Sequence, residues 1–477
     1  MNRLRVLFFK RMSACVVVAG LLTAGLHAES RASLLVFLHV TVINPGSASV
    51  ERNRAVVIRD GRITKVGSAS GFKTPAGAKV VDGTGEYMIP GLWDMHVHSA
   101  FGDWFPRGRE VILPLFVANG VTGVRDMGGD LPVLFEWRKE IAAGEIAGPR
   151  MVVSGPMLDG FLPSGKTTRF PSSIPVITAE EARKAVDSLK AQGVDFIKIQ
   201  SVIPHDAYVA AAEEAHRDGL PLVGHVPDHI KITESVALGQ VSIEHFMGVL
   251  EGCSSQEDML LQGSGNTKLM LSTYDDGKCQ SLISLLAKTH TWQVPTTAWN
   301  RQGTFLDQVD MVHQPLDRYV PVAWREVTWK RFYDEMMPGV TADPLVLRKE
   351  WMQQILHEIG ELHKGGVEFM AGTDTAPGIY VMPGFSLHDE LANFVEAGFT
   401  PMESLATATS NPAKFLSKSD MGAIAPGMLA DVVMLDANPL EDIRNTEKIR
   451  AVVADGRYYD RVRLDRMLSD VEKAAKR

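Results

Sequence analysis

Hydrophobic positions near the two ends of the chain fall into short runs with β-forming residues. Turn signals such as Asp60-Gly61 separate these runs, a pattern typical of β-strands. The runs lie at 34–43, 54–58, 62–66, 79–81, 431–435 and 449–453. They predict a small β-sandwich domain of antiparallel strands, built from the discontinuous segments 34–88 and 420–462.

Between these segments, apolar strand-like runs alternate with helical stretches. One predicted helix, at 182–192, follows Thr178 and Glu181 at the spacing of a capping box. Eight buried strands are predicted at 91–97, 121–126, 151–154, 196–199, 222–226, 242–246, 291–296 and 367–371. Strands and helices in alternation predict an α/β fold, a (β/α)8 TIM barrel over 89–419. Residues 300–345 exceed a normal connection and predict a helical excursion that serves as a lid or a packing surface.

The start of the chain has the pattern of a secretory signal. An uncharged apolar stretch at 12–26 precedes the small residue Ala28 and is too short to span a bilayer comfortably. A cationic segment precedes it, with Arg3, Arg5, Lys10 and Arg11. We expect residues 1–28 to be a cleaved signal peptide, so that the protein is exported, periplasmic or secreted, with no membrane segment after cleavage. An uncleaved anchor is the alternative.

Composition and charge narrow the class of protein. The chain has 477 residues, 45% of them hydrophobic, which is an ordinary globular composition with room for more than one core. Without residues 1–28, 45 basic residues face 57 acidic ones, so we expect no nucleic-acid partner. Three cysteines are too few for a disulfide scaffold. After export, Cys253 and Cys279 either pair or remain two separate thiols.

Candidate metal ligands stand at the ends of several predicted strands. His96 and His98 are two positions apart, and alternate strand side chains point the same way, so both imidazoles can reach one metal ion. Four later strands end in Lys198, His225, His245 and Asp374. The C-terminal strand ends of such a barrel carry its active site. The residues alone therefore predict metal-assisted hydrolysis. We expect no phosphate-binding loop after a strand, and the chain has no GxSxG elbow.

The ordered set of motifs resembles the metal-dependent amidohydrolase superfamily, and within it the group related to imidazolonepropionase and Xaa-Pro dipeptidases. The motifs are Ile89-Pro-Gly-Leu-Trp-Asp-Met-His-Val-His, Gly193-Val-Asp-Phe-Ile-Lys-Ile, Gly224-His-Val-Pro, Ser242-Ile-Glu-His, Ala371-Gly-Thr-Asp, Asn411-Pro-Ala and Gly427-Met-Leu-Ala-Asp-Val-Val-Met-Leu. The resemblance covers nearly the whole chain after residue 28. It is specific for the superfamily and much less specific for a substrate.

The resemblance implies a centre of two divalent metal ions, usually zinc. One ion would be held by His96, His98 and Asp374, and the other by His225 and His245. Lys198 would bridge both ions after its amine takes up carbon dioxide, because the carbamate offers two anionic oxygens where an ammonium offers no lone pair. If Lys198 instead reaches along the sheet surface to solvent, the site would hold one ion.

The expected mechanism uses a metal-activated hydroxide, since bound metal lowers the pKa of water. Asp374 is expected to accept the proton as hydroxide attacks and to pass it to the leaving nitrogen. His229, Tyr380 and Arg125 are weaker candidates for substrate contacts. An exposed loop histidine and an internal ion pair are the alternatives for His229 and Arg125. We expect Glu244 to face the helix layer, because adjacent strand residues point to opposite sides.

These features predict an exported amidohydrolase that cleaves the C–N bond of a small-molecule amide, in a dipeptide or an N-acyl amino acid. Two alternatives stay open. One is a mononuclear deaminase or cyclic-amide hydrolase with Lys198 uncarboxylated, and the other is a catalytically inactive metal-bearing binding protein. A homo-oligomer is compatible with the sequence.

Overall fold

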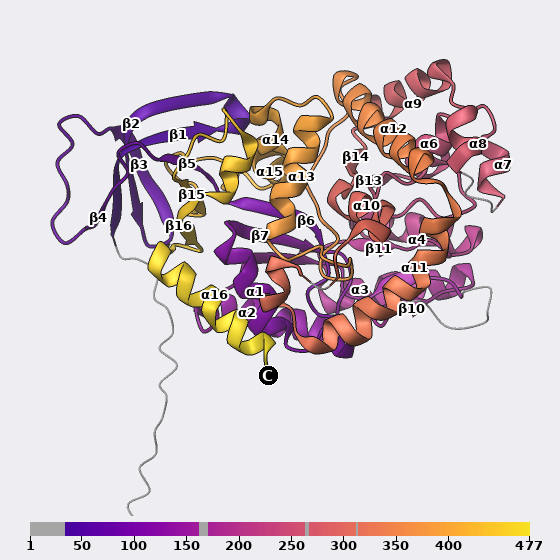
Figure 1. Ribbon diagram of the computed structural model, residues 1–477, viewed down its shortest axis with the longest axis horizontal. Helices are drawn as coiled ribbons and strands as arrows, with labels where there is room; N and C mark the ends of the chain where they lie inside the picture. Colours follow the sequence, from indigo (N-terminus) through magenta and orange to yellow (C-terminus); the bar gives the residue numbers. More distant parts are fainter. Residues whose placement is uncertain (1–33, 162–169, 263–266, 312) are drawn as a thin grey trace, which may run out of the picture.

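The structure is a computed structural model that describes residues 34–161, 170–262, 267–311 and 313–477. The predicted signal peptide lies outside the described residues. Within them, no helix is both long enough and apolar enough to cross a bilayer. The first and last strands of the chain share one end of the molecule, and the middle of the chain forms the other (Figure 1).

Eight strands from both ends of the chain form one mixed sheet. They are β1 (Leu35–Asn44), β2 (Ser49–Arg59), β3 (Arg62–Ser68), β4 (Lys79–Asp82), β5 (Tyr87–Pro90), β15 (Val432–Leu435), β16 (Ile449–Ala454) and β17 (Arg457–Asp460). The order is β17-β16-β15-β5-β1-β2-β3, with β4 also paired to β1. Buried side chains such as Leu35, Phe37, Val56 and Val432 give this sheet an apolar cluster of its own.

This sheet differs from the expected sandwich of antiparallel strands. All eight strands belong to one hydrogen-bonded sheet, and β4 and β5 both run parallel to β1. The reason is that the two short strands follow each other along the same edge. Leu35 pairs with Lys79, and farther along β1 Thr41 pairs with Tyr87.

The middle of the chain contains two parallel sheets. One has the order β6-β7-β8 and the other the order β10-β9-β11-β12-β13-β14. Their bounds are β6 (Leu92–Val97), β7 (Val121–Asp126), β8 (Arg150–Val153), β9 (Met157–Asp159), β10 (Ser173–Pro175), β11 (Ile197–Ile199), β12 (Leu222–Gly224), β13 (Gln240–Glu244) and β14 (Trp292–Val294). Seven of the eight predicted strands are therefore confirmed.

The eighth predicted strand, 367–371, is not a regular strand, and the two sheets are not joined by one continuous ladder. Backbone hydrogen bonds nevertheless cross both gaps. Asp195 N donates to Val153 O at 2.9 Å, and Met370 N donates to Gln293 O at 3.0 Å. Met95 N in turn donates to Ala371 O at 2.8 Å. The strand ends of both sheets are thereby held around one central region.

Helices follow most of these strands and cover them. They include α1 (Gly108–Ala118), α2 (Leu131–Ala143), α3 (Ala179–Gln192), α4 (His205–Arg217), α5 (Ile232–Ala237), α9 (Asp276–Thr289), α12 (Leu345–Lys364), α13 (Phe385–Glu396) and α14 (Pro401–Thr407). The capping box predicted for α3 is present: Thr178 Oγ1 accepts from Glu181 N, and Glu181 Oε2 accepts from Thr178 N. The last helix, α16 (Arg461–Ala475), packs on α1.

Residues 297–342, here called the helical excursion, confirm the prediction of a helical segment. They form α10 (Thr297–Thr304), three short turns and α11 (Lys330–Ala342). Trp324 and Trp329 are fully buried. Trp324 Nε1 donates to Pro106 O at 2.9 Å, and Thr328 Oγ1 donates to Trp104 O at 2.7 Å. The excursion is therefore fastened to the loop that follows β6.

Cys253 and Cys279 form a disulfide between the end of α6 (Val249–Gly252) and α9. Of the two possibilities that the sequence left open, the structure has the paired one. A disulfide sulfur lacks the thiolate charge that binds metal, so this pair is separate from the site chemistry.

Candidate metal centre

Three predicted ligands come together where β6 ends. A donor atom from each of His96, His98 and Asp374 lies within 4.8 Å of the other two. Asp374 Oδ1 is 3.2 Å from His98 Nε2 and 3.6 Å from His96 Nε2. The backbone supports this arrangement, since Asp374 N donates to His96 O at 2.8 Å. The group is a possible His–His–Asp metal site.

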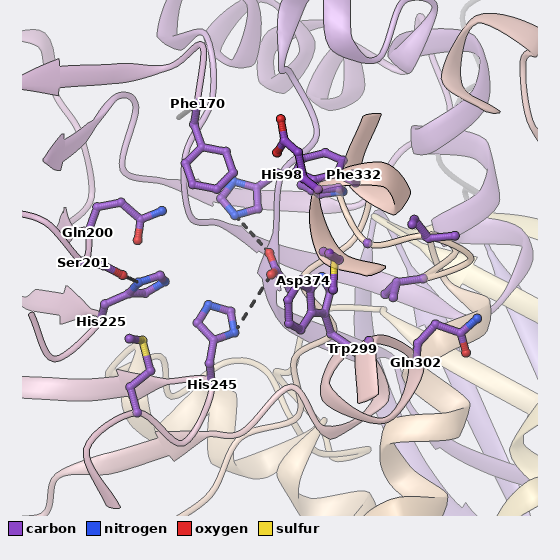
Figure 2. A pocket seen from close by; sticks show the side chains of 18 of the residues that line it. His98, Phe170, Gln200, Ser201, His225, His245, Trp299, Gln302, Phe332 and Asp374 are labelled. Carbon is purple, nitrogen blue, oxygen red and sulfur yellow. Dashed lines mark hydrogen bonds and ion pairs between the residues drawn. The ribbon is translucent and has the colours of Figure 1, made fainter. Parts of the chain in front are cut away.

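Two further predicted ligands follow β12 and β13 on the neighbouring sheet. The ring of His245 lies 4.6 Å from that of His96 and 4.7 Å from that of His225, measured between centroids. His245 Nδ1 is 4.0 Å from Asp374 Oδ2. Figure 2 shows Asp374 between His98 and His245, with His225 beside them. The structure thus brings all four histidines to one place.

Each of these histidines has its ring fixed by an oxygen. The Nδ1 atoms of His96, His98, His225 and His245 lie 2.8, 2.9, 2.7 and 2.8 Å from Glu244 Oε2, Gly128 O, Ser201 Oγ and Thr296 Oγ1. The Gly128 carbonyl can only accept, so His98 Nδ1 carries a proton. Such outer hydrogen bonds orient metal-binding imidazoles.

Lys198, the last predicted ligand, lies on β11 and is 1% exposed. Among the described residues, its Nζ atom has no hydrogen-bond partner. Burial lowers the pKa of this amine to about 8. The amine is therefore buried and does not reach along the sheet to solvent.

Two observations indicate that these residues fit a divalent metal ion. Within the described chain, His96 Nε2 is buried without a hydrogen-bond partner, as is Lys198 Nζ, and such orphaned groups are costly unless a ligand satisfies them. Burial also lowers the pKa values of His96 and His225 well below the ordinary range and that of His245 to about 4. Neutral imidazoles are the form that binds metal.

Asp374 remains ionised in this setting. Burial acts to raise the pKa of its carboxyl group, but the hydrogen bond from His98 and the nearby His245, His98 and Lys198 lower the pKa overall. An ionised carboxylate at this position can ligate a cation or accept a proton.

The position of Glu244 contradicts one prediction. Its side chain faces the candidate ligand His96 and not the helix layer. Its carboxylate accepts from His96 Nδ1 at 2.8 Å and from Arg125 Nη2 at 2.9 Å. The alternation rule fails here because β13 ends at Glu244 and His245 has a left-handed backbone with φ of 60°. The side chain of His245 is therefore no longer directed by the strand pleat.

The structure also changes the interpretation of Arg125, which was a candidate for a substrate contact. It is fully buried, and its guanidinium contacts Glu244, Ser242 Oγ and Met95 O. The internal ion pair, which the sequence left as the alternative, is what the structure has. Arg125 supports Glu244, and Glu244 in turn orients His96.

The other two weak candidates for substrate contacts lie away from the cavity wall. His229 is exposed, and its Nδ1 lies 2.8 Å from Leu261 O. Tyr380 donates to Asp317 Oδ1 at 2.9 Å and its ring packs on Trp329. Neither belongs to the described residues that line the cavity. Tyr380 therefore holds the helical excursion to the loop after Asp374.

Two further buried carboxylates hold the segments that carry the candidate ligands. Asp94 Oδ2 accepts from Thr373 Oγ1 at 2.7 Å, which joins β6 to the segment before Asp374. Asp126 Oδ2 accepts from Ser99 N at 2.7 Å and so fixes the loop after His98. The available signal was an acidic residue inside a strand that is otherwise apolar.

A phosphate-loop pattern also escaped the sequence reasoning. Residues 160–167 read Gly-Phe-Leu-Pro-Ser-Gly-Lys-Thr, which matches GxxxxGK[ST] and follows β9. Residues 162–169 lie outside the described chain. The next described element is strand β10, and α3 begins only at Ala179. The prediction that no such pattern follows a strand is therefore wrong. A P-loop also needs a helix directly after the Lys-Thr pair, and the described elements do not have that order.

A cavity of about 850 Å³ opens over the candidate ligands. His98, His225, His245 and Asp374 line its floor, and the helical excursion contributes Trp299, Gln302, Leu306, Phe332 and Met336. This volume suits a small organic molecule. Parallel strands with His and Asp ligands at their carboxyl ends define an α/β enzyme with a possible metal site.

Comparison with known proteins gives the family. The model described as "Amidohydrolase family" matches residues 87–458. The chain therefore belongs to the amidohydrolase family, whose members are hydrolases that act on carbon–nitrogen bonds. The resemblance inferred from the sequence motifs is confirmed.

Individual relatives are distant. Ochratoxinase from Aspergillus niger is 24% identical over 463 residues, which cover 89% of this chain and 86% of the relative. Imidazolonepropionase from Deinococcus deserti is 23% identical, with 85% and 92% covered. A solved Xaa-Pro dipeptidase with bound methionine in the active site is similar with a TM-score of 0.65 at 21% identity, over 90% of this chain and 100% of that one. This last likeness concerns the fold.

Proposed function

We propose that the protein hydrolyses the amide C–N bond of a dipeptide or an N-acyl amino acid at a binuclear metal centre. The observation that carries this proposal is the position of Lys198. Its buried Nζ has no hydrogen-bond partner among the described residues, and its charge acts on the pKa values of His96, His225, His245 and Asp374. A bare ammonium is costly in that position, whereas a carbamate would supply anionic oxygens to two cations.

The predicted ligands form two groups, one for each ion. His96, His98 and Asp374 would hold one ion and His225 and His245 the other, with carboxylated Lys198 between them. Imidazole and carboxylate ligands suit zinc. When bound, the ions lower the pKa of a coordinated water and polarise the substrate carbonyl.

Asp374 would move the proton. Its Oδ1 lies 3.2 Å from His98 Nε2 and its carboxylate lines the cavity, so one oxygen can ligate while the other faces the substrate. We infer that the carboxylate accepts a proton from the attacking water and donates it to the leaving nitrogen. The Glu244–Arg125 pair would keep His96 in the orientation that ligation requires.

Two further proposals concern architecture and location. We propose that β6, β7, β8, β11, β12, β13, β14 and segment 367–375 form one eight-membered barrel, supported by the backbone hydrogen bonds at both gaps. The division into two domains, 34–88 with 420–462 and 89–419, stays a prediction, as does a homo-oligomer.

We also propose export to the periplasm or medium, and the Cys253–Cys279 disulfide supports an oxidising compartment.

Metal counting on the full chain, combined with a panel of dipeptides, N-acyl amino acids and lactams, tests the proposal. We expect two equivalents of metal per chain and hydrolysis of linear amides. One equivalent together with lactam opening or ammonia release would favour the mononuclear alternative. Failure to hydrolyse any amide at full metal loading would reject the proposed substrate class.

Lys198→Ala tests the bridging role. We expect metal content to fall and short carboxylic acids such as acetate to restore part of it by standing in for the carbamate. Lys184→Ala, at an exposed lysine of α3, is the matched control and should retain wild-type metal content. Unchanged metal in Lys198→Ala would remove Lys198 from the centre.

A further inference from the structure

One corner of the cavity contains three hydrogen-bond acceptors close to the candidate metal ligands. Asp159, Gln200 and Asp228, here called the acceptor corner, all line the cavity. They come from the ends of β9 and β11 and from the loop after β12. None of them is used by the chemistry proposed above.

The corner is built by the backbone. Asp159 is 3% exposed, and its Oδ1 accepts from Gly160 N at 2.9 Å and from Val202 N at 3.1 Å. Its Oδ2 takes part in neither bond. A Cβ atom at Gly160 would collide with the carbonyl of Val202, so glycine is required for this close approach. Asp228 N donates to Ser201 O at 2.9 Å, which fixes the third member.

Gln200 indicates that the corner receives a ligand. Its side chain is 5% exposed, and within the described residues its Oε1 has no hydrogen-bond partner. Among the described residues the amide nitrogen has only Met157 Sδ as a partner, at 3.7 Å, and a thioether is a weak acceptor. Figure 2 shows the Gln200 amide directed into the space between His98 and His225. A buried amide oxygen left without a partner is costly. A hydrogen-bond donor from the substrate would satisfy this oxygen.

We propose that the acceptor corner binds the α-ammonium group of an unblocked dipeptide. This inference rests on the proposed function and decides between its two substrate classes. Two carboxylates and an amide oxygen offer acceptors to a group that has three donors and no lone pair. An N-acyl amino acid has no cation at that position and would leave the Gln200 amide oxygen without a donor.

The location agrees with the shape of a dipeptide. Ser201, next to Gln200, holds His225 through a 2.7 Å contact between Oγ and Nδ1, so the corner adjoins the candidate metal centre. In a dipeptide the ammonium nitrogen is separated from the scissile carbonyl carbon by a single atom. A carbonyl at the metal centre therefore brings the ammonium group to the corner.

The test uses two substrates that differ only in the ammonium group, phenylalanyl-alanine and 3-phenylpropanoyl-alanine, with the metal-replete full chain. Loss of a charged hydrogen bond corresponds to about 10- to 100-fold in kcat/KM, so we expect the dipeptide to be preferred by about that factor. In Asp159→Asn and in Gln200→Leu the preference should fall toward one, because only the dipeptide becomes slower. Asp159→Asn keeps an oxygen for both backbone donors.

Two controls separate the possible results. Gln192→Leu, at an exposed glutamine at the end of α3, should leave the preference unchanged, and metal content of each variant reports on the centre. Equal turnover of both substrates by the wild type, or equal losses for both in the variants, would overturn the ammonium site while leaving the proposed function intact. If neither substrate is cleaved but other amides are, the substrate class itself is wrong.

Discussion

The two walls of the cavity are built in opposite ways. On the wall formed by the strand ends, the histidine rings are each held by an oxygen, and His96, Glu244 and Arg125 are fully buried. On the wall formed by the helical excursion, Phe332 and Met336 are only half-buried and contribute apolar surface. The first wall is held by buried polar networks and the second by packing. From this difference we expect the chemistry to take place at the strand ends and the excursion to contribute to the fit of the substrate.

Three residues at the strand ends also have an unfavourable backbone conformation. His245, Thr296 and Asp374 all have left-handed φ values, at 60°, 46° and 60°, and all three belong to the strand-end wall. Non-glycine residues in this conformation cost about 1–3 kcal/mol each and concentrate at functional sites. The rest of the fold therefore holds these three residues in a backbone conformation that is locally unfavourable.

The largest effect is expected from Asp374→Asn. An amide keeps an oxygen that can ligate but cannot accept the proton, so kcat should fall by at least about 100-fold while at least one metal ion stays bound. Steady-state kinetics and elemental analysis measure the two quantities. Asp206→Asn, at a carboxylate that is 91% exposed on α4, is the control. Near-normal turnover would remove Asp374 from the proton pathway.

Glu244→Gln should act through His96. The variant removes the charge that the Nδ1 atom of His96 and the Arg125 guanidinium share, and loss of such a partner costs about 10- to 100-fold in metal affinity or activity. Breaking a buried pair also destabilises by about 3–5 kcal/mol, since the remaining charge is unpaired. Chelator competition measures the affinity, and thermal unfolding of metal-free protein measures the stability.

A second variant separates the two consequences. In Glu244→Gln with Arg125→Met, the unpaired cation is gone, so part of the stability should return while metal affinity stays low. If affinity recovers together with stability, Glu244 acts on the fold and does not position His96.

Much of the strand-end wall was predictable from the sequence. Buried parallel strands have continuous apolar runs, and a polar residue at the end of each run is conspicuous, so His96, His98, His225, His245 and Asp374 could be selected one by one. Seven of the eight strands were found for the same reason. The role of Glu244 was not predictable, because the pleat rule fails where His245 turns left-handed. For Arg125, an internal ion pair was one of two alternatives, but its partner could not be named.

The other wall and the acceptor corner depend on contacts between distant segments. Periodicity and composition indicated helix over 300–345, but the position of Phe332 over the cavity results from Trp324 and Thr328 bonding to the loop after β6. Asp159 and Gln200 lie 41 positions apart and meet because β9 pairs with β11 and Val202 N donates to Asp159 Oδ1. No local pattern carries that information.

The smallest effect is expected from Phe332→Ala on the excursion. The ring of Phe332 lies 5.5 Å from that of Trp104 and lines the cavity, so its truncation removes apolar surface that contacts substrate in ground and transition states alike. Such uniform binding appears in KM, which should rise by about 3- to 10-fold, with kcat and metal content unchanged. Lys330→Ala, at an exposed residue of the same helix, should leave KM unchanged. A loss of metal or a fall in kcat in Phe332→Ala would mean that the excursion also shapes the metal centre, and the two walls would then not be independent.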